Sequence, residues 1–224
     1  MTIRRTLRRV HIWLGWIVGI PLLFWTVSGL WMALRPIEEV RGTALRADPP
    51  ALVLPQSVVL PDAHGRPIRS LTLEPRPGRA IWVARFADNG ARRADAATGA
   101  WLGPLSPAEA QALGRAAYRG TAAVSGLALS AASNPPLDLR QPRPAWQVAF
   151  ADGTHVYIDA DTGATLALRT AQWRGYDWMW GLHIMDLGGR EDTSHAILIG
   201  TAAIALLTVL LALVLLPMVS RRRR

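Results

Sequence analysis

Histidine is the residue type in this chain best suited to chemistry near neutral pH, because imidazole both transfers protons and ligates metal ions. The sequence contains five histidines: His11, His64, His155, His183 and His195. His11 stands at the start of a long apolar run, whereas His183 and His195 precede a second run. A Gly188-Gly189 break separates these last two, so their imidazoles can converge on one metal ion.

Other catalytic constellations are absent from the sequence. The lack of cysteine excludes disulfides, thiolate nucleophiles, iron–sulfur clusters and cysteine zinc sites. All 25 basic residues are arginine, so no lysine is present for a Schiff base or a phosphate-binding loop. Neither a G-x-S-x-G nor an H-E-x-x-H motif occurs, and no dinucleotide-binding motif is found. A redox role would therefore need electrons from a partner protein or from quinol.

Two apolar segments have the length of membrane spans. No charge occurs from Ile12 to Leu34 or from Ala196 to Val219, and both stretches exceed the roughly 20 residues that cross a bilayer. The sequence predicts a basic tail over 1–10, a span over 11–34, a domain over 35–190, a second span over 195–219 and a basic tail over 220–224. The first span is longer than a usual signal-peptide core and no cleavage site follows it, which favours an uncleaved anchor.

The positive charge is concentrated at the outer ends of these spans. Four arginines precede the first span and four end the chain, whereas the other 17 arginines and all 16 acidic residues lie between the two spans. This positive-inside pattern predicts that both termini are cytoplasmic and that the central domain is periplasmic, in a bacterial inner membrane. The net charge of +9 then needs no nucleic-acid partner to explain it.

The central region contains an internal repeat with an offset of 64 residues. Residues 82–100 and 146–164 are identical at nine of nineteen positions. Each copy has the pattern of a β-hairpin with a turn at Asp88-Asn89-Gly90 or Asp152-Gly153, followed by a D-x-x-T-G turn. The repeated aspartates are therefore interpreted as turn formers rather than catalytic acids.

A helix is predicted ahead of the second hairpin only. Ser106 as N-cap, Pro107 and Glu109 form a helix start signal, and the helix continues to about Tyr118. The stretch 49–61 is broken by prolines and predicts extended chain, and 130–144 predicts a loop. The predicted fold is an α+β membrane protein: two transmembrane helices flank a periplasmic domain of two helix-plus-hairpin repeats, about 45–100 and 106–165.

Three stretches of the chain resemble bacterial PepSY-associated transmembrane proteins. Residues 8–16, RRVHIWLGW, are similar to that family's opening H-x-W-x-G, and a Ser28-Gly29 pair follows. The D-x-x-T-G hairpins resemble PepSY modules. Residues 180–189, WGLHIMDLGG, resemble the family's L-H segment before the last span.

The resemblance implies a function in iron metabolism. Some fuller members, which have about four spans, act as inner-membrane reductases of ferric siderophores, and their transmembrane histidines hold b-type haem. Position by position, this implies His11 and His183 as axial ligands of haem iron, and His195 is a further candidate. The alternative is a non-enzymatic, membrane-anchored PepSY module that binds or regulates a periplasmic partner such as a peptidase.

The position of His11 bears on assembly. With a helical rise of about 1.5 Å per residue, His11 lies one membrane thickness from Leu34 and cannot share one iron with His183 or His195 of its own chain. Gly15 and Gly19 have the G-x-x-x-G spacing that lets helices approach closely. We therefore predict a homodimer through the first span, in which two copies of His11 bind b-type haem.

Each histidine also has an interpretation without chemistry. A histidine at a helix end beside tryptophan is a common interfacial anchor, and this applies to His11, His183 and His195. His64 lies in a turn and His155 on a repeat strand, and both are predicted to be surface residues. The aromatic residues from Trp173 to Trp180 are interpreted as an interfacial belt, or alternatively as one wall of a cofactor or siderophore pocket.

Overall fold

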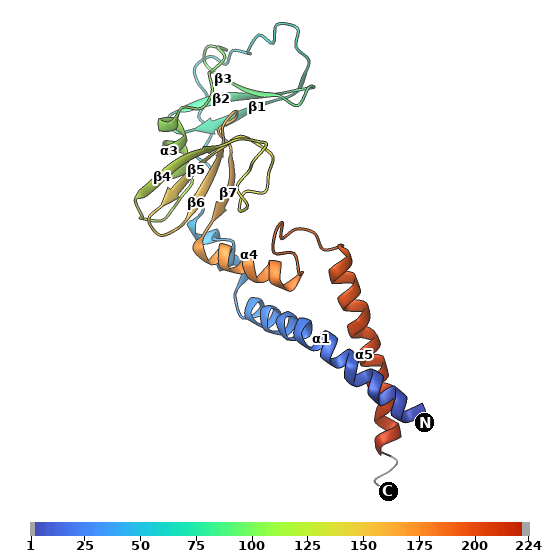
Figure 1. Ribbon diagram of the computed structural model, residues 1–224. Helices are drawn as coiled ribbons and strands as arrows, with labels where there is room; N and C mark the ends of the chain where they lie inside the picture. The colour runs from blue at the N-terminus through green and yellow to red at the C-terminus, as the bar shows by residue number, and fades with distance from the viewer. Residues whose placement is uncertain (1–2, 221–224) are drawn as a thin grey trace. The chain divides into compact units, whose positions relative to one another are not determined.

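The structure is a computed structural model that describes residues 3–220 (Figure 1). The chain divides into two compact units. One is the globular unit Ile37–Arg174, and the other is a helical unit made of the described parts of Met1–Pro36 and Gly175–Arg224. Arg221–Arg224, predicted to form a cytoplasmic tail, lie outside the described residues.

The helical unit is built on two long helices that pack against each other, α1 (Ile3–Ala33) and α5 (Ala196–Ser220). Both are long and apolar enough to cross a membrane, judged by length and composition. Only 6% and 11% of the residues in their most apolar windows are buried, so neither is a covered core helix of a soluble protein. The two helices therefore suggest that the protein is anchored in a membrane.

A third helix, α4 (Ala171–His183), was not predicted from the sequence. Its first turn is capped by Thr170, whose Oγ1 accepts a hydrogen bond of 2.9 Å from the backbone N–H of Trp173. The aromatic segment is thus helical, and it begins in the globular unit and ends in the helical unit. Two short elements, α2 (Ile37–Val40) and a 3₁₀ turn η1 (Thr43–Leu45), lie between α1 and the strands.

The globular unit contains two antiparallel sheets. The three-stranded sheet has the order β1 (Ile68–Arg76), β2 (Arg79–Phe86) and β3 (Ala91–Asp95). The four-stranded sheet has the order β4 (Val124–Ser130), β5 (Ala145–Phe150), β6 (His155–Asp159) and β7 (Thr165–Arg169). The chain is therefore of mixed α+β class, as predicted, and two possible membrane-spanning helices stand at the ends of its sheet-rich region.

The turns of the predicted repeat are confirmed in both sheets. Asn89 and Gly153, at equivalent positions of the two hairpin turns, both have positive φ, 66° and 79°. In each D-x-x-T-G turn the aspartate Oδ1 accepts two backbone N–H groups: Asp95 from residues 97 and 98, and Asp159 from residues 161 and 162. The repeated aspartates therefore hold turns, as the sequence indicated.

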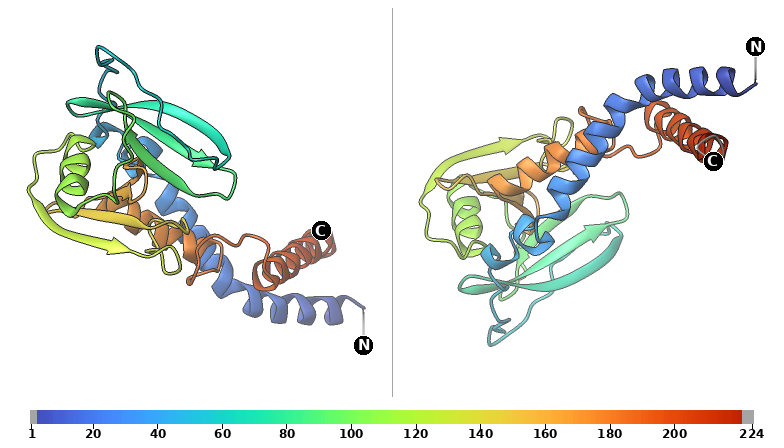
Figure 2. Two further views of the ribbon diagram at one scale, coloured as in Figure 1. Left: turned by 90° about the horizontal axis from the view of Figure 1, so that it is seen from above. Right: turned by 90° about the horizontal axis from the view of Figure 1, so that it is seen from below.

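The helix α3 (Pro107–Ala116) covers one face of the four-stranded sheet (Figures 1 and 2). Its start has the predicted capping box, in which Ser106 and Glu109 bond reciprocally. Gly114 allows close approach, since a Cβ there would lie 2.5 Å from Val148. The first repeat has no such helix. There the chain is extended, and the indole of Trp82 donates to the Val59 carbonyl, as that of Trp146 donates to Leu105 in the second repeat.

The opposite face of the four-stranded sheet is covered by the predicted loop between β4 and β5, residues 131–144. Leu139 is 1% exposed and packs on Ala145, Tyr157 and Ala167. The sheet thus has an apolar core on both faces, one under a helix and one under a loop.

Candidate functional site

His183, at the end of α4, packs against α1 in the helical unit. Its Nδ1 lies 3.0 Å from the Oγ of Ser28, a residue with no exposed surface. The indole of Trp180 stacks on the imidazole with ring centroids 6.4 Å apart, and Trp25 lies at 5.9 Å in a tilted arrangement. The ring is therefore fixed by one polar contact and two aromatic neighbours.

The hydrogen bonds of Ser28 define the tautomer of His183. The Ser28 hydroxyl lies 2.6 Å from the Phe24 carbonyl, which can only accept, so the hydroxyl proton is used there. Ser28 Oγ must then accept from His183 Nδ1–H. In a neutral imidazole this places the lone pair on Nε2. Metal-ligating histidines have the same arrangement, with one nitrogen donating to a protein group and the other directed to the metal.

His195 immediately precedes α5 and uses both of its ring nitrogens. Its Nδ1 accepts the backbone N–H of Leu198 at 3.4 Å, and its Nε2 lies 2.9 Å from the Ile184 carbonyl. Because Nδ1 accepts, Nε2 must carry the proton that is donated to Ile184. A metal at His195 would displace one of these two bonds.

The segment that joins α4 to α5 is held by polar contacts. Arg190 forms an ion pair of 3.0 Å with the buried Asp177 of α4. Asp186 accepts the backbone N–H groups of Gly189, Glu191 and Asp192, and these bonds hold the pKa of its carboxyl below the usual value. These contacts fix the loop between α4 and α5, and the loop in turn fixes the positions of His183 and His195 at its two ends.

His11 is far from the other two histidines along α1. Its Nδ1 is buried and has no hydrogen-bond partner in the described part of the chain. Seventeen residues separate it from Ser28, which corresponds to about 25 Å of helix. One chain therefore does not bring His11 and His183 to the same metal. No group of three or more potential metal ligands among His, Asp and Glu occurs within the described residues.

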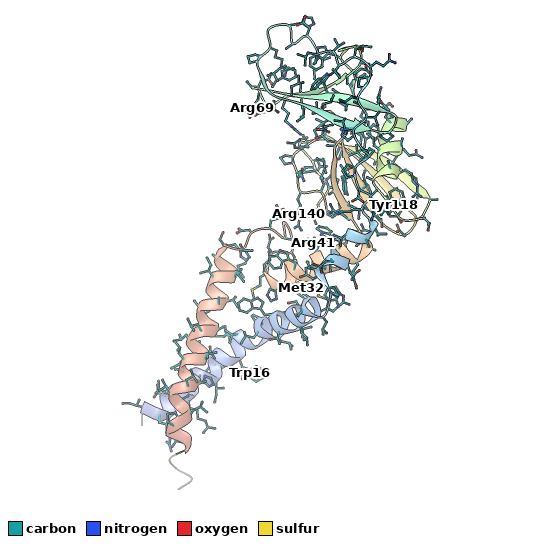
Figure 3. All side chains as sticks on the ribbon, turned by 180° about the vertical axis from the view of Figure 1, so that it is seen from behind. Trp16, Met32, Arg41, Arg69, Tyr118 and Arg140 are labelled. Atoms are coloured by element: carbon teal, nitrogen blue, oxygen red, sulfur yellow. The ribbon has the colours of Figure 1, made fainter. Side chains whose placement is uncertain are left out.

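The G-x-x-x-G face of α1 is not used against α5. A Cβ at Gly15 or Gly19 would meet no atom within 4 Å. The two glycines form the floor of a groove of about 400 Å³ with Ile12, Ile20 and other apolar neighbours. Trp16, on the margin of this groove, is 75% exposed (Figure 3).

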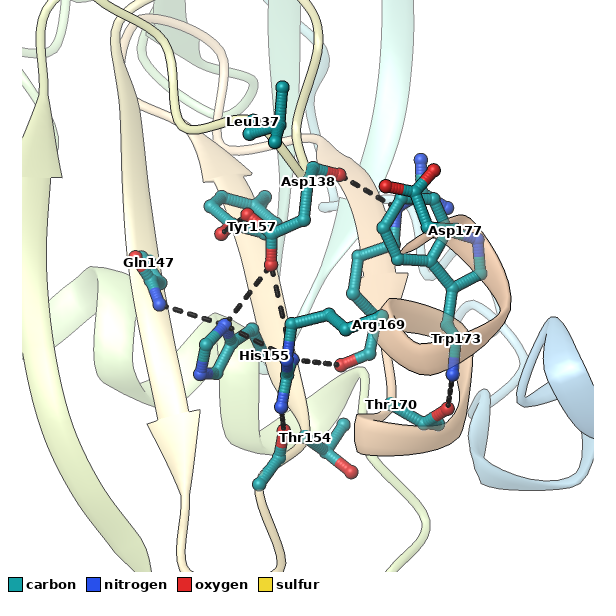
Figure 4. Close-up of polar contacts among 12 residues, drawn as sticks. Leu137, Asp138, Gln147, Thr154, His155, Tyr157, Arg169, Thr170, Trp173 and Asp177 are labelled. Atoms are coloured by element: carbon teal, nitrogen blue, oxygen red, sulfur yellow. Dashed lines mark hydrogen bonds and ion pairs between the residues drawn. The ribbon is translucent and has the colours of Figure 1, made fainter. Parts of the chain in front are cut away.

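A polar cluster in the globular unit surrounds His155 (Figure 4). His155 Nδ1 lies 3.2 Å from the Asp138 carboxylate and 2.9 Å from Gln147 Nε2, and Tyr157 donates its hydroxyl to the same carboxylate. Arg174 of α4 lies 3.9 Å from Asp138. The prediction that His155 is a surface residue was wrong, because its side chain is 23% exposed, whereas His64 is exposed as predicted.

Ionisation in this cluster favours an anionic Asp138. Burial alone would raise the pKa of its carboxyl, but hydrogen bonds from His155 and Tyr157 outweigh burial and hold that pKa below the usual value. Burial and the bond to Asp138 raise the pKa of Tyr157 well above that of free tyrosine. The carboxylate therefore attaches the 131–144 loop to β6 through charge-assisted bonds.

The family model described as peptidase propeptide and YPEB domain, PepSY, matches residues 104–169. These residues form a PepSY domain. The match extends from just before α3 to the end of β7, and the two apolar helices stand on either side of it, which is consistent with a PepSY-associated transmembrane protein. No curated protein and no solved structure matches the chain.

The family match identifies the second repeat alone. The first repeat has equivalents of β4, β5 and β6 and of their turns, but lacks the equivalents of α3 and β7. Between the PepSY domain and the first repeat lies a cleft of about 490 Å³, entirely within the globular unit. No sequence motif indicated this cleft, because residues from four separate segments line it.

Proposed function

We propose that this protein is a haem-binding redox component of the bacterial inner membrane that serves iron or ferric-siderophore reduction. In this proposal both termini are cytoplasmic and the PepSY domain is periplasmic. One observation carries it: the bond between Ser28 and His183 leaves the Nε2 lone pair of a fixed imidazole free. That is the state in which histidine ligates haem iron.

In each chain, His183 would hold the iron of a b-type haem through Nε2. Bound haem would supply one-electron transfer. Ser28 holds His183 in its tautomer, and Trp25 and Trp180 limit rotation of the ring. His195 is the weaker candidate because both of its nitrogens are engaged.

For His11, the second histidine ligand would be the His11 of a second copy of the chain. The open face at Gly15 and Gly19 supports a homodimer through α1. A two-fold axis along this face would bring His11 near its own copy at one end of α1. Ser28 lies about 180° around α1 from Gly19, so His183, which contacts Ser28, would face away from this axis.

The test is the absorption spectrum of the full chain purified in mild detergent from haem-replete cells. We expect a Soret band, with split α and β bands on reduction, that is diminished in His11→Ala and in His183→Ala. The matched control is His64→Ala, which removes an exposed histidine paired with Asp62 and should leave the spectrum unchanged. A colourless wild-type protein would reject the redox proposal.

A second candidate is a membrane-anchored PepSY module that binds or regulates a periplasmic protein. The cleft beside α3 favours it, because its size is that of ligand sites and its walls are largely apolar. This function requires no haem. A colourless protein that still binds a partner would therefore be consistent with the binding module.

A further inference from the structure

The cleft in the globular unit has an apolar floor and a proline-rich rim. Leu113 and Ala116 of α3 and Leu168 of β7 form part of its floor. Prolines from two segments stand around it: Pro49, Pro50, Pro75 and Pro77. A site of about 490 Å³ with such walls accommodates a small apolar group or a few residues of polypeptide.

Residues of two edge strands line this cleft. β1 is an outer strand of the three-stranded sheet and contributes Glu74 and Arg76, whereas β7 is an outer strand of the four-stranded sheet and contributes Thr165. No backbone hydrogen bond connects the outer edge of either strand to another segment within the described residues. At the cleft, Pro75 of β1 has no N–H and its carbonyl accepts from Arg76 Nη1 at 2.9 Å, so the outer edge of β7 is the one that presents donors and acceptors to an extended peptide.

The charges around the cleft leave one cation uncompensated. Glu74 pairs with Arg76 at 2.9 Å, and Asp48 pairs with Arg119. Arg46 also lines the cleft, is exposed, and has no ion pair with any acid of the described chain. An occupant with one negative charge would complement it.

We propose that this cleft binds the C-terminal end of an extended apolar polypeptide, whose free carboxylate pairs with Arg46. The main chain of the peptide would lie beside the outer edge of β7, and its apolar side chains would contact Leu113, Ala116 and Leu168. This inference rests on the second function, that of a binding module, and specifies the chemistry of the partner. It is independent of haem.

The test uses the tetrapeptide acetyl-Ala-Leu-Val-Leu with a free carboxylate, and its C-terminal amide, titrated into the full chain in detergent. We expect the acid to bind about fivefold more tightly than the amide, the upper range for a solvent-exposed ion pair. Arg46→Gln should reduce this ratio to about one. Arg41→Gln is the matched control, because Arg41 is exposed and does not line the cleft (Figure 3).

A second pair of variants tests whether the cleft is the binding site. Ala116→Trp places an indole in the cleft from an exposed position of α3 and should abolish binding of both peptides. Ala112→Trp, one turn earlier, is also exposed but outside the lining, and should bind as wild type. Equal affinity for acid and amide, with loss of both in Ala116→Trp, would overturn the carboxylate proposal but retain the binding module. No saturable binding to wild type, or unchanged binding to Ala116→Trp, would overturn the proposed site itself.

Discussion

The hydrogen bond between Ser28 and His183 gives the sharpest prediction for the proposed haem site. Ser28→Ala removes one oxygen from a side chain with no exposed surface and introduces no new bulk. His183 Nδ1–H then loses its acceptor, Ser28 Oγ at 3.0 Å. The ring would be free to exchange tautomers, and the lone pair would no longer be fixed on Nε2.

The size of the effect follows from the cost of an unsatisfied donor. Leaving a buried N–H without an acceptor costs about 1–3 kcal/mol, and each 1.4 kcal/mol corresponds to a factor of ten in affinity. We therefore expect Ser28→Ala to weaken haem binding about 10- to 100-fold, which is the usual effect of removing a hydrogen-bond partner of a ligating histidine.

The assay is a haem titration of the apoprotein in detergent, followed by Soret absorbance. Thr26→Ala is the matched control: Thr26 also bonds a carbonyl one turn back on α1, that of Leu22 at 2.8 Å, but does not touch His183. It should titrate as wild type. Unchanged haem affinity in Ser28→Ala, or an equal loss in Thr26→Ala, would refute the assigned role of the Ser28 hydroxyl.

Three further predictions concern the loop, its anchor and the dimer. Leu139→Ala should destabilise the globular unit by about 2–5 kcal/mol in denaturant unfolding of the full chain, because Leu139 is buried against β5, β6 and β7, whereas Leu137→Ala, at an exposed position, should not. Because the pKa of Asp138 is lowered in the folded protein, its carboxylate stabilises the fold at pH values above the ordinary pKa of 3.8, and this contribution is lost as the pH falls through the lowered pKa. Asp138→Asn should therefore be less stable than wild type near neutral pH. Its unfolding midpoint should fall less than that of wild type on acidification. Gly15→Leu should fill the groove on α1 and shift the protein toward monomer in light scattering, and an unchanged dimer would reject α1 as the interface.

The sequence predicted those features whose determinants are local. The capping box at Ser106 and the D-x-x-T-G turns depend on residues within four positions of each other, so their residue types were sufficient. The helix α4 was missed because its aromatic residues have low helix propensity, and it is held by its packing. The alternation of β6 placed His155 and Tyr157 on one face, but nothing in the sequence located Asp138 above them.

The structure gives a physical reason for the Ser28-Gly29 pair. The sequence marked the pair only as part of a resemblance, because His183 is 155 residues away along the chain. In the structure Ser28 supplies the oxygen that accepts from Nδ1, and a Cβ at position 29 would lie 3.2 Å from His183 Cε1. Serine thus provides the hydrogen bond and glycine provides the space for the ring. His183 would donate Nδ1–H to Ser28 whether it serves as a packing anchor or as a metal ligand. The two roles differ in whether Nε2 binds a metal ion.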